Sequence, residues 1–155
     1  MKTLLRAALG FLFIACLDAA GTELVDVSFV RGPARFKAGD AITIQKVQAT
    51  SPKVEDGDTV VVRGRYDLQS RDQASLSLFL TRTNGEGGER IEPAQTIAVT
   101  RGSGEFALIC DVRHAGALHV SFYGIPDGRP FGGVYFGPGP QMAKIKDWKL
   151  SDYQN

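Results

Sequence analysis

The sequence has few of the residues that form disulfides, metal sites and catalytic centres. It contains two cysteines, two histidines and one tryptophan in 155 residues. Cys16 falls in a predicted leader, so Cys110 is the only ordinary thiol of the processed chain, which excludes an intramolecular disulfide. We expect Cys110 to be a buried small hydrophobe and the fold to be stabilised by apolar packing. The sparse cysteines and histidines resemble no zinc signature.

An excess of either charge is also lacking. The chain has 18 basic and 17 acidic residues, and its first 21 residues hold Lys2, Arg6 and Asp18, so 16 of each sign remain beyond them. A neutral domain with interspersed signs has no electrostatic basis for binding nucleic acid or an anionic membrane. We therefore expect no nucleic-acid partner. The length leaves room for one domain.

Residues 1–21 predict a signal peptide. Lys2 and Arg6 precede an apolar run, Ala7 to Leu17, which has the length of a signal-peptide core. That run is shorter than the roughly 20 apolar residues that span a bilayer. We expect a signal helix here, cleavage after Gly21 and an extracytoplasmic protein, either secreted or periplasmic.

A second processing route starts from Phe13-Ile14-Ala15-Cys16, which is similar to a bacterial lipobox. Cys16 would then become the lipidated first residue, and the lipid would be the only link to a membrane. Under the first route a single domain covers residues 22–155. Under the second, the leader ends before Cys16 and the same domain follows.

Beyond the leader, short runs of alternating apolar and polar residues predict an all-β fold. In one such run Leu76, Leu78 and Leu80 share a face. No later stretch has a 3.6-residue period, so we expect a two-sheet antiparallel β-sandwich of eight or nine short strands, with a small barrel as the alternative. Gly102-Ser103-Gly104 predicts a hairpin turn. The predicted strands are Leu24–Val30, Ala41–Val47, Thr59–Asp67, Ala74–Thr83, Gln95–Arg101, Glu105–Val112, Gly116–Tyr123, Phe131–Phe136 and Ala143–Leu150.

Two strands begin with the same pattern, Gly-Asp-x-(Ile/Val)-x-(Ile/Val). It occurs at Gly39 to Ile44 and again at Gly57 to Val62. A glycine allows a positive φ in the turn, and the aspartate carboxylate can accept a hydrogen bond from a nearby backbone N–H. The pattern, with residues 39–136 around it, resembles bacterial extracytoplasmic immunoglobulin-like β-sandwich domains. The resemblance implies a fold and a location, and it carries no active site.

The segment from Tyr123 to Pro140 combines aromatic residues with many glycines and prolines. Aromatic rings on such loops can stack against a glycan or a peptide. The alternative is that these rings cap the core at the strand ends. The candidate ligand-binding residues are Tyr123, Phe131, Tyr135, Phe136 and Trp148.

A hydrolase is the competing function, with His119 as base, Ser121 as nucleophile and Asp111 orienting the histidine. Adjacent positions on one strand face are about 7 Å apart, and no nucleophile-elbow motif occurs. We therefore expect His119 to be solvated or partner-facing, and we assign no catalytic residue.

Two clusters of acidic or histidine residues are candidate metal sites. The first joins Asp111, His114 and His119, and the second is the acidic turn with Glu55, Asp56 and Asp58, whose oxygen ligands would suit Ca²⁺. An Asp/Gly turn before a strand forms without a metal, so we predict neither a metal nor a cofactor.

The sequence thus favours an exported non-enzymatic binding or structural module. Its expected partner is a glycan or a protein at the cell envelope. A further possibility is that Phe131–Phe136 is an edge strand that pairs with a partner strand.

Overall fold

The computed structural model describes residues 23–82 and 91–148. The prediction of an all-β fold is confirmed, because seven antiparallel strands make up most of the described chain. A short 3-10 helix, η1 (Pro93–Gln95), precedes the fifth strand, and a helix, α1 (Gly139–Lys144), follows the last. The strands are β1 (Val25–Asp26), β2 (Val30–Arg35), β3 (Ala41–Ala49), β4 (Thr59–Thr81), β5 (Thr96–Asp111), β6 (Ala117–Tyr123) and β7 (Pro130–Gly137).

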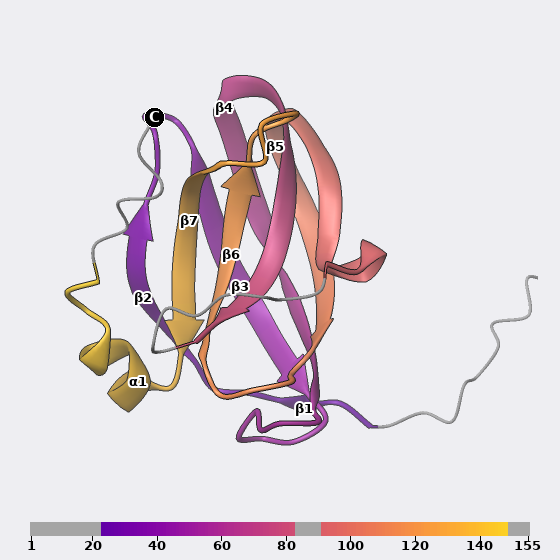
Figure 1. The fold of residues 1–155 in the computed structure, drawn as a ribbon, viewed down its shortest axis with the longest axis vertical. Coiled ribbons are helices and arrows are strands. Elements are labelled where there is room, and N and C mark those ends of the chain that lie inside the picture. Colours follow the sequence, from indigo (N-terminus) through magenta and orange to yellow (C-terminus); the bar gives the residue numbers. More distant parts are fainter. Residues whose placement is uncertain (1–22, 83–90, 149–155) are drawn as a thin grey trace, which may run out of the picture.

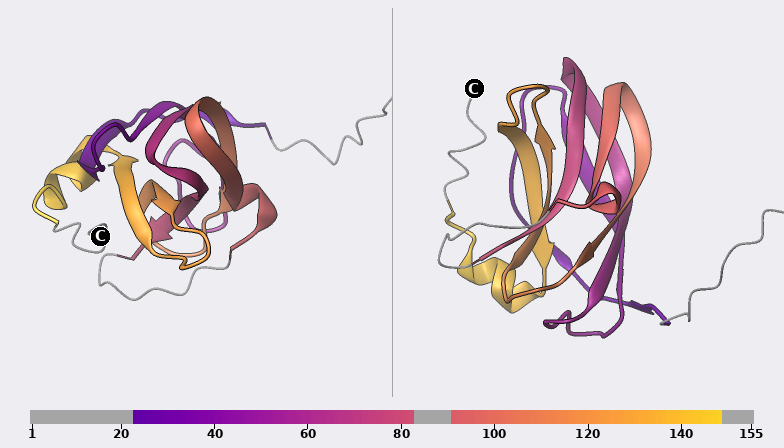
Figure 2. Two further views of the ribbon diagram at one scale, coloured as in Figure 1. Left: turned by 90° about the horizontal axis from the view of Figure 1, so that it is seen from above. Right: turned by 45° about the vertical axis from the view of Figure 1, so that its right-hand side comes forward.

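The strands form one hydrogen-bonded sheet in the order β1-β3-β4-β6-β7-β2, with β5 also paired to β4. The long strand β4 has three neighbours. Its first half pairs with β3 and β5, and its second half pairs with β5 and β6. Because β4 and β5 bend together, the sheet curls, and its strands surround a common interior (Figures 1 and 2).

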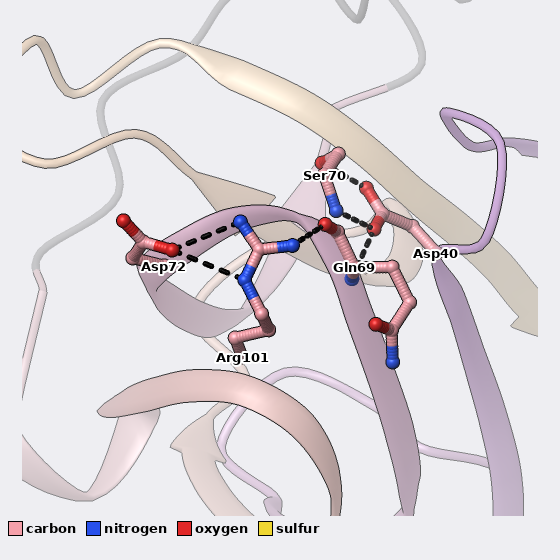
Figure 3. A network of polar contacts seen from close by, with 5 residues as sticks. All are labelled: Asp40, Gln69, Ser70, Asp72 and Arg101. Atoms are coloured by element: carbon pink, nitrogen blue, oxygen red, sulfur yellow. Dashed lines mark hydrogen bonds and ion pairs between the residues drawn. The ribbon is translucent and has the colours of Figure 1, made fainter.

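A register shift between Leu68 and Gln73 produces the bend in β4. The carboxylate of Asp40 accepts hydrogen bonds from the backbone N–H groups of Gln69 and Ser70, at 2.8 and 2.9 Å (Figure 3). The Ser70 hydroxyl donates to the same carboxylate at 2.5 Å. A β-bulge leaves backbone groups without a ladder partner, so a buried carboxylate at this point satisfies them. The first Gly-Asp turn therefore holds the bend.

The facing strand β5 accommodates the bend with a glycine and an arginine. Gly102 has a φ of +117°, a conformation that L side chains rarely adopt. Arg101 donates hydrogen bonds to the carboxylate of Asp72 and to the carbonyl oxygen of Gln69 (Figure 3). The bend is thus supported from both strands.

One main core fills the inside of the curl. Phe122, Phe131 and Phe136 are its largest fully buried side chains. The predicted inward face of the Ala74–Thr83 run is confirmed, and so is the burial of Cys110. A smaller cluster lies apart from this core, where Tyr135 packs with Met142 and Ile145 near helix α1.

Several predicted strand boundaries are wrong. Residues 59–67 and 74–81 belong to one strand, and Gly102-Ser103-Gly104 lies inside β5 rather than in a hairpin turn. Glycines in a long bent strand produce the same local pattern as a turn. Leu24–Val30 is not continuous, and β2 continues beyond Val30 through residues 31–35.

The predicted strand Ala143–Leu150 is also wrong over its described part. Helix α1 ends at Lys144, and a turn follows. Pro140 lies in the first turn of this helix, where its missing N–H costs no hydrogen bond. The expected signal helix and Cys16 lie outside the described residues.

Candidate functional site

A cavity of about 370 Å³ opens at the end of the curled sheet where helix α1 lies. This is the lower end of the molecule in Figure 1. Its walls come from the segment before β2, the β3–β4 loop, the β5–β6 loop, residues of β3, β4, β6 and β7, and helix α1. Most of its walls are apolar, and they reach into the main core. The apolar lining residues are Val27, Phe29, Val47, Val54, Leu80, Val112, Ala115, Leu118, Phe136 and Pro138.

The cavity has a polar rim with both signs of charge. Lys53, Glu55 and Asp56 come from the β3–β4 loop, and His114 comes from the β5–β6 loop. No ion pair within 4.0 Å joins Lys53 to a carboxylate of the described chain. Gln141 on α1 donates a hydrogen bond to the carbonyl oxygen of Gly116 at 2.7 Å, which ties two walls together. The rim can therefore accept a polar group, and the interior is lined mainly by apolar side chains.

The β3–β4 loop is fixed by Asp58. Its carboxylate accepts hydrogen bonds from the hydroxyls of Ser51 and Thr50, each at 2.6 Å, and from the N–H of Glu55 at 2.5 Å. These bonds, that of Ser51 first, lower the pKa of Asp58 below its ordinary value of 3.8. In the second Gly-Asp turn the aspartate thus accepts a hydrogen bond from a nearby backbone N–H, as predicted from the sequence.

The same loop holds Val54 with a φ of +56°, in the left-handed region. That conformation is unfavourable for a β-branched residue and persists only where the surroundings impose it. Here the Asp58 hydrogen bonds fix the loop, and the Val54 side chain packs against the main core and lines the cavity. The strained residue therefore forms part of the cavity wall.

His119 and Ser121 are in contact, contrary to the prediction. The ring Nδ1 of His119 lies 2.9 Å from the Ser121 hydroxyl. Gly133 faces Ser121 across the β6–β7 pair, and a Cβ there would lie 2.2 Å from the Ser121 hydroxyl oxygen. The glycine therefore leaves room for the hydroxyl beside the histidine.

The expectation that His119 is solvated is wrong. Only 6% of its surface is exposed, and its ring lies between Phe79 and Tyr135, at centroid distances of 5.8 and 4.8 Å. Burial lowers the pKa of His119 to about 3, so the ring is neutral at pH 7. These three residues are direct cross-strand partners on β4, β6 and β7, which explains the row of rings.

Asp111 does not join this pair. It lies exposed at the end of β5, where its carboxylate accepts a hydrogen bond from the Thr59 hydroxyl at 2.9 Å. Arg113 lies 3.7 Å from the same carboxylate. Within residues 23–82 and 91–148, no group of three or more His, Cys, Asp or Glu side chains is placed to hold a metal ion.

The five candidate aromatic residues do not share an exposed face. Phe131 and Phe136 lie in the main core, and Tyr135 is buried in the smaller cluster. Tyr123 and Trp148 are half-buried, and each packs edge-on against another ring, Phe79 and Tyr135 respectively. In this structure, capping and filling of the core describe these rings better than an open platform.

Alternation along Phe131–Phe136 predicts that Phe131 shares a face with Tyr135. This prediction is wrong, and so is the expected edge strand. The β6–β7 register shifts at Tyr123, so Phe131 turns to the side of Val134 and Phe136. It stacks on Phe122 at 5.6 Å, and the Arg71 guanidinium lies 4.2 Å from its ring centre. Strand β7 pairs with β6 and β2 on its two sides and has no free edge.

Sequence reasoning missed the cavity because its walls come from distant segments. The clearest local indication of the cavity is Val54. It is the single aliphatic side chain in Ser51–Asp58, a segment otherwise typical of an exposed turn. Phe29 gives a weaker signal, because it also suits a strand that faces the core.

A search with the sequence found no matching protein family, no similar characterised protein and no similar solved structure. Within the described part of the chain, no helix has the length and apolar character needed to span a membrane.

Proposed function

We propose that this protein is an exported, non-enzymatic binding module that holds a small, largely apolar ligand in the cavity beside helix α1. The observation that carries the proposal is the cavity itself, with apolar walls that reach the core and a charged rim. Its volume of about 370 Å³ falls in the range typical of small-molecule sites, about 300–1,000 Å³.

The composition of the walls defines the ligand class. A compact ring system or a short acyl chain gains free energy by leaving water for the apolar lining, at about 25 cal/mol per Å² of buried apolar surface. A polar end on such a ligand can contact Lys53, Glu55 and Asp56 on the rim. A fully apolar ligand can also bind, because these rim residues are exposed to water.

The exported location is part of the proposal, and it rests on the leader. We keep both routes, secretion after cleavage at Gly21 and lipid anchoring at Cys16. We also keep the proposal of an immunoglobulin-like sandwich, in which the two halves of the curled sheet serve as its layers. A ligand site at one end of the strands is compatible with either route, since α1 and the loops form it without the leader.

We do not extend the proposal to the hydrolase alternative. The contact between His119 and Ser121 favours it, since a nucleophile and its base must be in hydrogen-bond reach. The Ser121 side chain is fully buried, however, and Asp111 lies exposed on a strand that does not pair with β6. A substrate cannot reach that serine without opening the structure.

The test is binding of the apolar dye N-phenyl-1-naphthylamine, followed by its fluorescence. Ala115→Trp places a large ring in the cavity wall, and Ala98→Trp places the same ring on an exposed position of β5 outside the cavity. We expect saturable binding by the unaltered protein and a loss of affinity of at least about tenfold, or about 1.4 kcal/mol, in Ala115→Trp.

The Ala98→Trp variant should bind the dye as the unaltered protein does. The proposal fails if no saturable binding is observed. It also fails if both tryptophan variants lose affinity equally, because the dye would then bind elsewhere or the loss would come from destabilisation.

A further inference from the structure

Strand β5 has an outer edge that no other described strand covers. Along Thr96–Asp111 it pairs with β4 alone (Figure 1). Unpaired N–H and C=O groups on such an edge are a template for another strand. The opposite end of the sheet is better protected, because β2 carries Pro33 and a register break between Arg31 and Ala34.

The second half of β5 is the regular part of this edge. From Gly104 to Asp111 it pairs with β4 without a register shift, so its backbone is straight enough to accept a partner. Alternate side chains enter the core, and the others face outward and are exposed. Ile109 is the outward residue that stands out, because 41% of its large apolar side chain remains exposed.

Self-pairing of this strand has one register that suits its charges. In an antiparallel two-fold pair centred on Ile109, Glu105 of each copy lies opposite Arg113 of the other. A pair centred on Leu108 would instead oppose Glu105 and Asp111, which are both acidic. Like charges directly opposite each other destabilise a strand pair, and opposite charges stabilise it.

Arg113 is available for this contact. Its side chain is 55% exposed, and its ion pairs with Glu92 and Asp111, at 3.2 and 3.7 Å, lie on the surface. Exposed ion pairs contribute little and exchange partners at low cost.

We propose that two copies of this chain pair through the β5 edges, with Ile109 at the two-fold axis, so that the sheet continues across the dimer. The two Ile109 side chains cover each other, and Glu105–Arg113 pairs close both ends. The side chains that carry this interface, Glu105, Ile109 and Arg113, are not among those that line the ligand cavity.

Cysteine cross-linking tests the register directly. Opposed residues of an antiparallel pair have Cα atoms about 4.5–5.5 Å apart, within the range that a disulfide spans. Ile109→Cys should therefore form a covalent dimer under mild oxidation. In the control Ala107→Cys, the two new thiols lie four residues apart along the strands, about 13 Å, so this variant should stay uncross-linked.

The unaltered protein, which keeps Cys110, gives the background for both variants. Equal cross-linking of the two variants would overturn the register. Absence of any Ile109→Cys dimer above background, with an unchanged circular dichroism spectrum, would overturn the interface.

Sedimentation of charge variants provides an independent readout. Glu105→Arg should weaken the dimer, and adding Arg113→Glu should restore it, because the swap recreates both opposite-charge pairs. The proposal fails if the unaltered protein is monomeric at every concentration, or if the double variant dimerises no better than Glu105→Arg alone.

Discussion

The ionisation of His119 is coupled to folding because its ring is buried. The pKa of His119 is about 3 in the folded protein and about 6.5 in the unfolded chain. Above pH 6.5 the ring is neutral in both states. Between pH 6.5 and 3 only the unfolded chain takes up the proton, so acidification stabilises the unfolded state. His119 thus makes the protein sensitive to mild acid.

We predict that the free energy of unfolding falls as the pH drops from 6.5 toward 3, and that His119 contributes about 1.4 kcal/mol per pH unit to this slope. His119→Phe keeps a ring between Phe79 and Tyr135 and removes the titration. Urea unfolding at pH 7, 6, 5 and 4 measures how the free energy of unfolding changes with pH in the unaltered protein and in His119→Phe.

The control for that experiment is His114→Phe, because His114 is only partly buried. A change in slope that both variants share would come from the substitution by phenylalanine rather than from the burial of His119. If His119→Phe leaves the pH dependence of the unfolding free energy unchanged, His119 is not a buried neutral ring in the folded protein. Acidification should also disturb Asp58 at lower pH, since the stability that its lowered pKa provides is lost as the pH falls through that pKa.

Among the elements, the paired strands β4 and β5 determine the shape of the molecule. Both bend at one level, where the backbone of Gln69 and Ser70 leaves the ladder and bonds to Asp40 (Figure 3). Asp40 is only 7% exposed and its hydrogen bonds to Gln69 and Ser70 are partly buried, so its loss would leave these N–H groups without their acceptor at the bend. Asp72 lies at the same bend with its side chain 91% exposed.

We therefore predict that Asp40→Ala lowers the free energy of unfolding by about 2–3 kcal/mol, because two backbone N–H groups and one hydroxyl lose their acceptor. Asp72→Ala should cost less than about 1 kcal/mol, as is usual for an exposed ion pair. Chemical denaturation of the two variants measures the difference, and equal losses would contradict the role of Asp40 in holding the bend.

For the whole molecule, alternation predicted the β class and most of the buried face. The period of two identifies which residues point inward wherever a strand is regular, as from Phe106 to Cys110. It fails at bulges, and a shift of one residue moved Phe131 to the opposite face. The pattern Gly102-Ser103-Gly104 predicted a turn, although it lies inside β5, because glycines at this spacing are typical of a bent strand as well as of a turn.

The candidate site was less predictable than the fold. The contact between His119 and Ser121 depends on the space beside Gly133 across the strand pair, and the cavity depends on several distant segments meeting at one end. The spacing of residues along the sequence predicts neither the contact between His119 and Ser121 nor the cavity. What the sequence did indicate is the use of Asp40 and Asp58, since a Gly-Asp turn before a strand has a definite hydrogen-bonding role.

The most direct test of ligand binding in the cavity is a set of amide ¹⁵N–¹H correlation spectra recorded while N-phenyl-1-naphthylamine is added. We predict saturable shifts centred on the amides of Val54, His114 and Gly116, which line the cavity. Shifts centred instead on Tyr123 and Trp148, or no saturable shifts, would contradict the proposed site.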